Sequence, residues 1–182
     1  MPRIAPITGK ADVPAAHHGV VDAVVKVFGG VRGPFSMLLH SPQLAERLLP
    51  LVTLFRDEST VEGTLRSVAI LAAVREREAA YVWSAQVGQA RRNGVAEASI
   101  DVLRAKGDPA GLPTDEREIV VYVRQLMRTN KVDQRAFDAL AKRHGAQWMV
   151  EMTAAANYFA MLCGVVNAFE VAAPPDGDKL PA

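Results

Sequence analysis

The sequence predicts an all-α protein that forms a single helical domain. Apolar residues recur at helical spacing through most of the 182 residues, and no run shows the apolar and polar alternation of a half-buried strand. No internal repeat of fixed period is visible. The composition, 49% hydrophobic and 23% charged, is that of a chain that can bury a sizeable core. We expect a single-domain helical bundle over residues 20–172, with an N-terminal extension at 1–19 and a disordered tail at 173–182.

Four helices are predicted in the first half of the chain, each with a recognisable start or end. The first ends at Gly29, a residue type favoured just after a helix. The second opens with Pro42, since proline is tolerated in a first helical turn. Ser59 followed by Glu62 has the pattern of a capping box, which predicts that the third helix starts there. The ranges expected are 20–28, 42–55, 59–72 and 78–93.

Four more helices are predicted in the second half. Thr114 is expected as the N-cap of a helix that carries acidic residues in its first turn, where they complement the helix dipole. Asp133 is expected to cap the next helix, and Gly145 to end it. A long apolar helix then closes the fold. The ranges expected are 96–105, 114–128, 133–145 and 147–171.

Charge and hydropathy exclude several partners. The formal net charge is +1, whereas nucleic-acid binding needs a concentrated basic face, so no nucleic-acid partner is expected. The one short basic cluster, Arg91 and Arg92, is interpreted as a solvated helix end. The N-terminal residues lack the apolar core of a signal peptide. The most apolar segment, 152–169, contains two asparagines and is interpreted as a core or subunit-interface helix rather than a membrane span.

Cysteine and histidine usage argues against disulfide and metal chemistry. Cys163 is the only cysteine, which fits a reducing cytoplasm and a small buried side chain. His17 and His18 are adjacent and therefore point to different helix faces. Only Asp22, four residues after His18, offers a second ligand at helical spacing. No metal site is therefore expected.

Residues 75–100 carry the most specific pattern. Where one group of known helical enzymes has Tyr-Glu-Trp-x-x-His, this chain has Tyr81, Val82 and Trp83, with Gln86 at the histidine position. The order and spacing of further stretches support the same comparison; they are FGGVRGPFSMLLHSPQLAERLLPL, STVEGTLRSVAILAAV, GVAEASIDVL and HGAQWMVEMTAAANYFAMLCGVVNAFEV.

On these motifs the chain resembles the carboxymuconolactone decarboxylase and alkyl hydroperoxidase D superfamily, and within it the decarboxylase-type branch. The resemblance covers roughly residues 27–171. It implies an all-helical subunit of the alkyl hydroperoxidase D-like type that assembles as a trimer or hexamer. It also implies no bound metal or organic cofactor and a small-molecule substrate.

The chain departs from that family at its reactive positions. Ser67, Ala79, Val82 and Gln86 stand where peroxidase-type members have a glutamate, two cysteines and a histidine. A thiol peroxidase needs a low-pKa thiolate and a resolving thiol, and Cys163 alone, away from the motif, supplies neither. The sequence therefore predicts that the protein is not a thiol peroxidase.

A stripe on the predicted 78–93 helix has two interpretations. Its members are spaced to share one helix face, which would be apolar apart from one amide; they are Ala79, Val82, Trp83, Gln86 and Ala90. In the family that face lines the pocket, so it would suit a largely apolar ligand. The alternative is that the stripe packs in the core.

Three residues are the catalytic candidates. Gln86 can donate a hydrogen bond to an enolate oxygen, but an amide cannot act as a general acid. His40 is the candidate proton donor because imidazole titrates near neutrality, the alternative being a capping or buried histidine. Arg66 can grip a substrate carboxylate, the alternative being an ion pair, for example with Glu151. The substrate-binding candidates are Ser67, Tyr81, Val82, Trp83, Asn157 and Tyr158.

Two functions remain as hypotheses. The first is a cofactor-independent lyase or isomerase, related to carboxymuconolactone decarboxylase, that acts on a small organic acid, lactone or enolisable compound. The second is a catalytically silent homologue that binds a small apolar ligand or serves as an oligomeric scaffold. Both hypotheses include a homo-oligomer, because the alanine-rich apolar closing helix is too extensive for a monomer to cover.

Overall fold

The computed structural model describes residues 2–181. Their regular secondary structure consists of helices, and they contain no strand. The prediction of an all-α chain is confirmed. The α-helices are α1 (His18–Phe28), α2 (Pro34–Leu38), α3 (Pro42–Thr53), α4 (Gly63–Glu76), α5 (Ala80–Arg92), α6 (Glu97–Arg104), α7 (Thr114–Thr129) and α8 (Gln134–Ala168). The shorter elements are a π-helical segment (Leu54–Glu58) and three 3-10 turns (Lys10–Asp12, Ala15–His17 and Pro109–Gly111).

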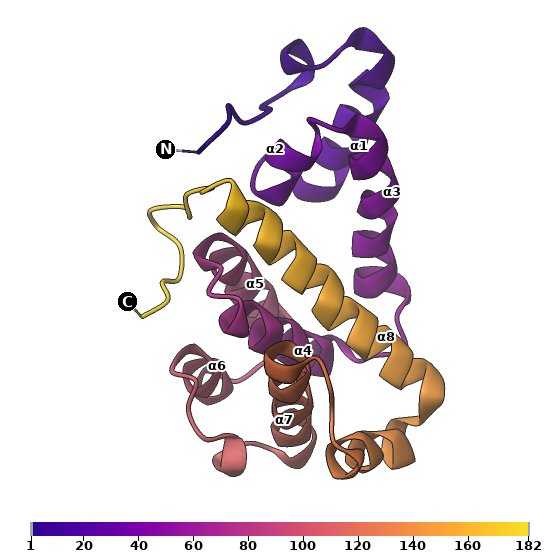
Figure 1. Cartoon of the computed structure of the whole chain (residues 1–182), viewed down its shortest axis with the longest axis vertical. Helices are drawn as coiled ribbons and strands as arrows, with labels where there is room; N and C mark the ends of the chain where they lie inside the picture. Colours follow the sequence, from indigo (N-terminus) through magenta and orange to yellow (C-terminus); the bar gives the residue numbers. More distant parts are fainter. Residues whose placement is uncertain (1, 182) are drawn as a thin grey trace.

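Helix α4 is the centre of the molecule. Every residue from Arg66 to Arg75 is buried, as expected for a helix that is apolar almost all round. It packs against α5, α7 and α8, while α1, α2 and α3 lie on the other side of α8 (Figure 1). The central position of α4 means that any polar side chain it carries faces another helix or an internal cavity.

Several predicted helix ends are confirmed. Gly29 follows α1 in the left-handed conformation, with φ of 74°, and its N–H bonds the carbonyl of Val25. Asp133 caps α8 by accepting a hydrogen bond from the Ala136 N–H at 2.8 Å. Gly145 has non-helical backbone angles inside α8. The two helices predicted on either side of Gly145 therefore form one element with a break.

The predicted capping box at Ser59 is wrong. Helix α4 begins at Gly63, and Glu62 is its N-cap residue without a capping hydrogen bond. The Ser59 hydroxyl donates to Glu151 on α8 at 2.9 Å, and the Glu62 carboxylate accepts from Trp148 on α8 at 3.0 Å. Both side chains are thus used in long-range contacts with α8. Thr114 is likewise the first residue of α7, not its N-cap.

Glu151 joins α8 to the segment before α4. Its carboxylate accepts hydrogen bonds from Gln147, from the Thr60 N–H at 2.6 Å and from Ser59. These bonds, that from Gln147 foremost, lower the pKa of Glu151 from 4.5 to about 2. The depressed pKa stabilises the fold above pH 4.5, and this contribution is lost as the pH falls toward 2.

We expect Glu151→Gln to lower the free energy of unfolding at pH 7 by about 1 kcal/mol, as for exposed hydrogen bonds to a charged group. The variant should also lose less stability than the parent between pH 5 and pH 3. Urea unfolding at the two pH values measures both effects. Parallel losses of stability in parent and variant would contradict this role.

Helix α8 is long and apolar enough to cross a membrane by length and composition alone, with a mean hydropathy of 1.4 in its most apolar window. However, 56% of that window is buried inside the protein, and Gly145 breaks the helix about one third of the way along it. Its packing against α4 and α7 accounts for the apolar residues. These contacts are those of a core helix.

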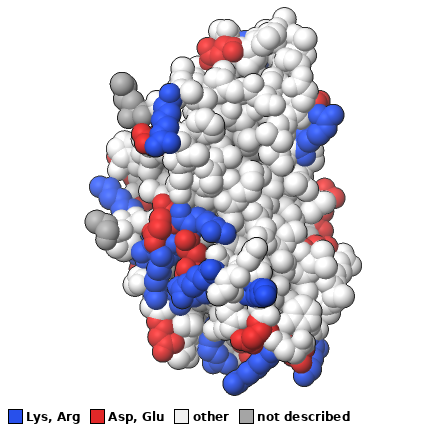
Figure 2. All heavy atoms as spheres, viewed as in Figure 1, with Lys and Arg blue, Asp and Glu red and all other residues white. Residues whose placement is uncertain are grey.

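One stripe of α8 remains exposed and carries no charge. Figure 2 shows few charged side chains over the central part of the face that α8 crosses. Val150 is the most exposed large apolar side chain, at 67%, and Met161 is exposed at 37%. The exposed members recur every three or four residues; they are Gln147, Val150, Ala154, Asn157, Met161, Gly164 and Ala168.

The described parts of both chain ends contact the helices. Ile7 is buried, and its N–H bonds the Ser36 carbonyl at 2.9 Å. In the C-terminal segment, Leu180 packs against the core and Asp178 pairs with Arg91 on α5 at 2.6 Å. The domain boundaries at residues 20 and 172, and the disorder expected beyond the second of them, stay predictions.

Candidate functional site

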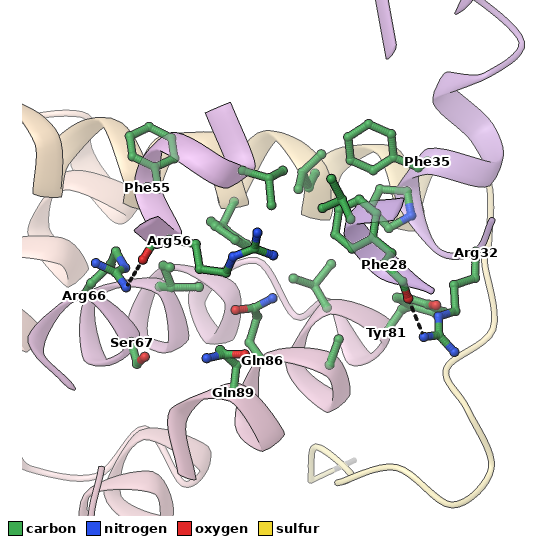
Figure 3. Close-up of a pocket in the computed structure, with 18 of the residues that line it drawn as sticks. Phe28, Arg32, Phe35, Phe55, Arg56, Arg66, Ser67, Tyr81, Gln86 and Gln89 are labelled. Carbon is green, nitrogen blue, oxygen red and sulfur yellow. Dashed lines mark hydrogen bonds between the residues drawn. The ribbon is translucent and has the colours of Figure 1, made fainter. Parts of the chain in front are cut away.

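A cavity of about 480 Å³ lies alongside α5. Helix α5 forms one wall, α4 and α8 contribute buried side chains, and α1, α2 and the end of α3 close the opposite side (Figure 3). Its lining combines aromatic and aliphatic side chains with arginines and amides, and contains no aspartate or glutamate among the described residues. This combination of an apolar wall and positive charge suits an anion with an apolar body.

The apolar wall comes from seven helical elements and the C-terminal segment. Its members are Val27, Phe28, Pro34, Phe35, Val52, Phe55, Ile70, Val82, Ala85, Phe159, Leu162 and Pro174. The tilted rings of Phe28 and Phe35 have centroids 5.1 Å apart, and Phe55 packs against Tyr158 at 5.7 Å. Aromatic contacts therefore fix the wall opposite α5.

Arg66 is the most buried cation of the cavity. It projects from the first turn of α4 and is 8% exposed. Its guanidinium donates to the carbonyls of Val61 at 2.7 Å and Arg56 at 3.1 Å, and it forms no ion pair within residues 2–181. Burial lowers the pKa of Arg66 below its usual value, yet a guanidinium stays charged at neutral pH.

The predicted alternative for Arg66 was an ion pair with Glu151. The Glu151 carboxylate instead binds Ser59, Thr60 and Gln147. The Asp57 carboxylate, which pairs with Arg56, attracts Arg66 from beyond ion-pair distance, but burial has the larger effect and lowers the pKa of Arg66. A buried guanidinium without an ion pair is unfavourable unless something else supplies further negative charge. The cavity in front of Arg66 is the place where an anionic ligand can do so.

Gln86 lies on α5 between the two ends of the cavity (Figure 3). It is half-buried, and its amide makes no hydrogen bond to the described part of the chain. Ser67, also in the lining, donates to the Gly63 carbonyl at 2.8 Å and accepts from the Asn93 amide at 2.8 Å. Gln86 is therefore free to bind a ligand, whereas Ser67 is already engaged.

Tyr81 sits at the far end of the cavity, held by its contact with Gly33. A Cβ atom at Gly33 would lie 2.7 Å from Cζ and 2.9 Å from the hydroxyl oxygen of Tyr81. Gly33 also has φ of +60°, a conformation that favours glycine. Burial raises the pKa of Tyr81, so its phenol is protonated at neutral pH and can donate a hydrogen bond.

The structure brings five of the nine predicted site residues together and places four elsewhere. Arg66, Ser67, Tyr81, Val82 and Gln86 line the cavity. The other four do not; they are His40, Trp83, Asn157 and Tyr158.

Two of these four are exposed. His40 follows α2, and its Nε2 lies 2.9 Å from the carbonyl oxygen of Ala5. Asn157 points outward from α8, and its amide donates to the carbonyl of Thr153 at 2.9 Å. Neither side chain reaches the cavity, which leaves it without an imidazole.

The other two belong to the core. Trp83 is fully buried, its Nε1 has no hydrogen-bond partner in the described chain, and the Arg104 guanidinium lies 5.9 Å from the ring centre. Tyr158 donates its hydroxyl hydrogen to the Leu48 carbonyl at 3.0 Å, and burial raises its pKa. The predicted stripe on α5 is thus divided, since Trp83 and Ala90 face the core while Val82 and Gln86 face the cavity.

Sequence reasoning missed three arginines at the cavity edge. Arg32, Arg56 and Arg92 are exposed and line the opening. Arg92 was interpreted only as a solvated helix end, although it lies six residues after Gln86 and its Nη2 donates to Gln89, also in the lining, at 2.8 Å. Arg56 is paired with Asp57 at 2.9 Å, so the net positive charge at the opening comes from Arg32 and Arg92, and it raises the local concentration of anions.

The C-terminal segment supplies part of the cavity edge. Pro174 lines the cavity, and Gly177 lies so close to Ser84 that a Cβ atom there would sit 2.8 Å from the serine Cβ. Asp178 pairs with Arg91 at 2.6 Å and Arg104 at 3.4 Å. The segment therefore rests on α5 and α6 beside the site.

Cys163 does not line the cavity, and burial raises its pKa to about 12, so the thiol stays protonated at neutral pH. No three His, Cys, Asp or Glu side chains in residues 2–181 gather as a metal site. Asp22, four residues after His18, forms an ion pair with Lys10 at 2.8 Å.

No family model matches the chain, and no curated protein matches it in sequence. Solved structures do match it. A complex of a debrominase Bmp8 variant with 2,3,4-tribromopyrrole has a TM-score of 0.75 and 15% identity, covering 96% of this chain and 95% of that one. An uncharacterised peroxidase-related protein with the alkylhydroperoxidase AhpD core, from Ralstonia eutropha JMP134, has a TM-score of 0.75 and 15% identity, with 95% of each chain covered.

A third structure is a putative antioxidant defence protein AhpD from Agrobacterium tumefaciens, with a TM-score of 0.66, 15% identity, and coverage of 76% of this chain and 96% of that one. The chain has the AhpD-like fold. The fold class predicted from the sequence is confirmed, and one protein with this fold, Bmp8, is an enzyme. At 15% identity the likeness extends to the fold alone, so the decarboxylase-type branch stays a prediction.

Proposed function

We propose that this AhpD-like chain is an enzyme that binds a small organic acid or related enolisable compound in the cavity beside α5. The observation that carries this proposal is Arg66, a buried guanidinium at the cavity without a carboxylate partner. A planar guanidinium matches a carboxylate in a bidentate pair, which Lys or an amide cannot form. The apolar wall would hold the body of the acid.

The reaction proposed is that of a lyase or isomerase that passes through an enolate. Arg66 would bind the substrate carboxylate or a related oxygen, and Gln86 would donate a hydrogen bond to the enolate oxygen as negative charge develops. His40, the proton donor that the sequence suggested, lies outside the cavity, so a water molecule bound beside the substrate would supply the proton. In a decarboxylation the C–C bond breaks, carbon dioxide leaves with no electrons from that bond, and the water molecule protonates the resulting carbon, leaving hydroxide.

A specific observation favours a second function, that of a catalytically silent protein that binds the same kind of ligand. No lining side chain in the described chain titrates near neutral pH in its ordinary state, because the cavity contains arginines, amides, a serine and Tyr81. A tyrosine is a weak acid at pH 7. A protein with this second function would bind its ligand through Arg66 and the apolar wall but would not convert it.

Native mass spectrometry with a panel of lactones, β-keto acids and aromatic acids, followed by product analysis, separates the two functions. A bound and transformed compound supports the enzyme. Binding without transformation supports the silent homologue, and no binding of any acid would contradict both. Gln86→Ala should abolish turnover while changing the free energy of unfolding by less than about 1 kcal/mol, because Gln86 makes no hydrogen bond to the described chain.

We also propose that the chain forms a homo-oligomer, a trimer or hexamer, through the uncharged exposed stripe of α8. Light scattering at micromolar concentration should give a multiple of the 19.6 kDa chain mass. Val150→Arg should shift the mass toward that of the monomer, since it places a charge on the stripe. Val121→Arg, at an exposed apolar residue of α7, is the matched control, and a monomeric parent protein would refute the proposal.

A further inference from the structure

The cavity has polar groups at both ends, and most of the side chains between them are apolar. In Figure 3, Arg66 and Ser67 lie toward one end, Tyr81 and Arg32 lie toward the other, and Gln86 lies between them. The lining residues of α5 extend from Tyr81 to Asn93, which corresponds to a helical rise of about 18 Å. The site is therefore elongated along α5.

The Tyr81 end is built to meet a polar group. The Tyr81 hydroxyl forms no hydrogen bond within the described chain, and the contact of its ring with Gly33 fixes its position. Arg32 bonds the Phe28 carbonyl through Nη2 at 2.8 Å, which leaves its other N–H groups free. A phenol and a guanidinium together favour an oxygen that accepts hydrogen bonds.

The middle of the cavity offers few polar groups. Its apolar members along α5 and the facing helices are Phe28, Phe35, Val82, Phe159 and Leu162. The polar side chains that Figure 3 labels there are Gln86, Gln89 and Arg56, and Arg56 is paired with Asp57 at 2.9 Å. An extended hydrocarbon segment would fill this part of the cavity and contact its apolar side chains. A short acid bound at Arg66 would instead leave Tyr81 without a ligand contact.

We propose that the ligand is an elongated organic acid with polar groups at both ends. Its carboxylate binds Arg66, its apolar body lies along α5, and a distal oxygen accepts hydrogen bonds from Tyr81 and Arg32. This inference rests on the proposed binding of an organic acid at Arg66. It adds the second binding point and the length of the ligand.

Isothermal titration calorimetry with two straight-chain series tests the inference. The probes are octanoate, decanoate and dodecanoate, and the dicarboxylates of the same chain lengths. At least one dicarboxylate should bind about tenfold more tightly than the monocarboxylate of equal length, as expected for one added charge-assisted hydrogen bond. Tyr81→Phe keeps the ring on Gly33 and removes only the hydroxyl.

Tyr81→Phe should remove most of the preference for the dicarboxylate while leaving the affinity for the monocarboxylate within about twofold. Equal affinities for both series in the parent protein, or a preference that survives in Tyr81→Phe, would overturn the inference and leave the proposed function standing. Binding of short aromatic acids but of neither long series would overturn it as well. Failure of every acid to bind would overturn both the inference and the proposed function.

Discussion

Replacing Arg66 by methionine is expected to weaken the binding of organic acids by about a hundredfold. A bidentate, charge-assisted pair with a guanidinium that is 8% exposed contributes about 2–3 kcal/mol to binding, which corresponds to that factor. Arg66→Lys keeps the charge but loses the planar fork, so it should recover only part of the affinity. Titration calorimetry with decanoate measures all three proteins.

Two controls accompany this prediction. Arg66 also donates to the carbonyls of Val61 and Arg56, so Arg66→Met is expected to lower the free energy of unfolding by about 1–3 kcal/mol, and binding must be measured where the variant is folded. Arg92→Met removes an exposed arginine at the cavity edge and should weaken binding by less than about fivefold. Unchanged affinity in folded Arg66→Met would refute the anion site.

Gly33→Ala is expected to cause the largest loss of stability of any glycine substitution near the site. The residue has φ of +60°, which disfavours alanine by about 1–2 kcal/mol, and the new Cβ would overlap the Tyr81 ring. Overpacking adds about 1–3 kcal/mol. We therefore expect a total loss of about 2–5 kcal/mol in urea unfolding, together with displacement of Tyr81 from the cavity.

Gly29→Ala is the matched control, because Gly29 has φ of +74° but no atom within 4 Å of the added Cβ. This variant should lose only the free energy of unfolding that a positive φ costs an alanine, about 1–2 kcal/mol. The double variant Gly33→Ala/Tyr81→Ala removes the overlap with the ring. Its loss of unfolding free energy should therefore equal the backbone cost of Gly33→Ala plus the cost of truncating Tyr81. An equal loss in Gly29→Ala and Gly33→Ala would show that the Tyr81 contact is not tightly packed.

The fold was largely predictable because its signals are local. Helical periodicity, Gly29 after α1, Asp133 before α8 and the break at Gly145 all depend on neighbouring residues along the chain. The capping box at Ser59 failed because its hydroxyl has a partner on α8, 92 residues away. A sequence pattern cannot show that competition between a local and a distant hydrogen bond.

The candidate site was predictable only in part, because helix spacing shows which residues share a face but not what lies opposite. On α5 the predicted stripe included Val82 and Gln86, which face the cavity, and Trp83, which packs in the core. His40 was linked to the site by its place in a motif, whereas α2 directs it toward Ala5. Arg92 was overlooked because charge at a helix end already had an explanation.

The central claim is that Arg66 binds the carboxylate of an organic acid, and NMR spectroscopy of the arginine side chains tests it most directly. The Nε–H of Arg66 makes no hydrogen bond within the described chain, so a carboxylate should shift its resonance strongly, with assignment by comparison with Arg66→Lys. We expect saturable titration of this signal by decanoate with the affinity found by calorimetry. An unmoved Arg66 signal in a protein that binds decanoate would contradict the account.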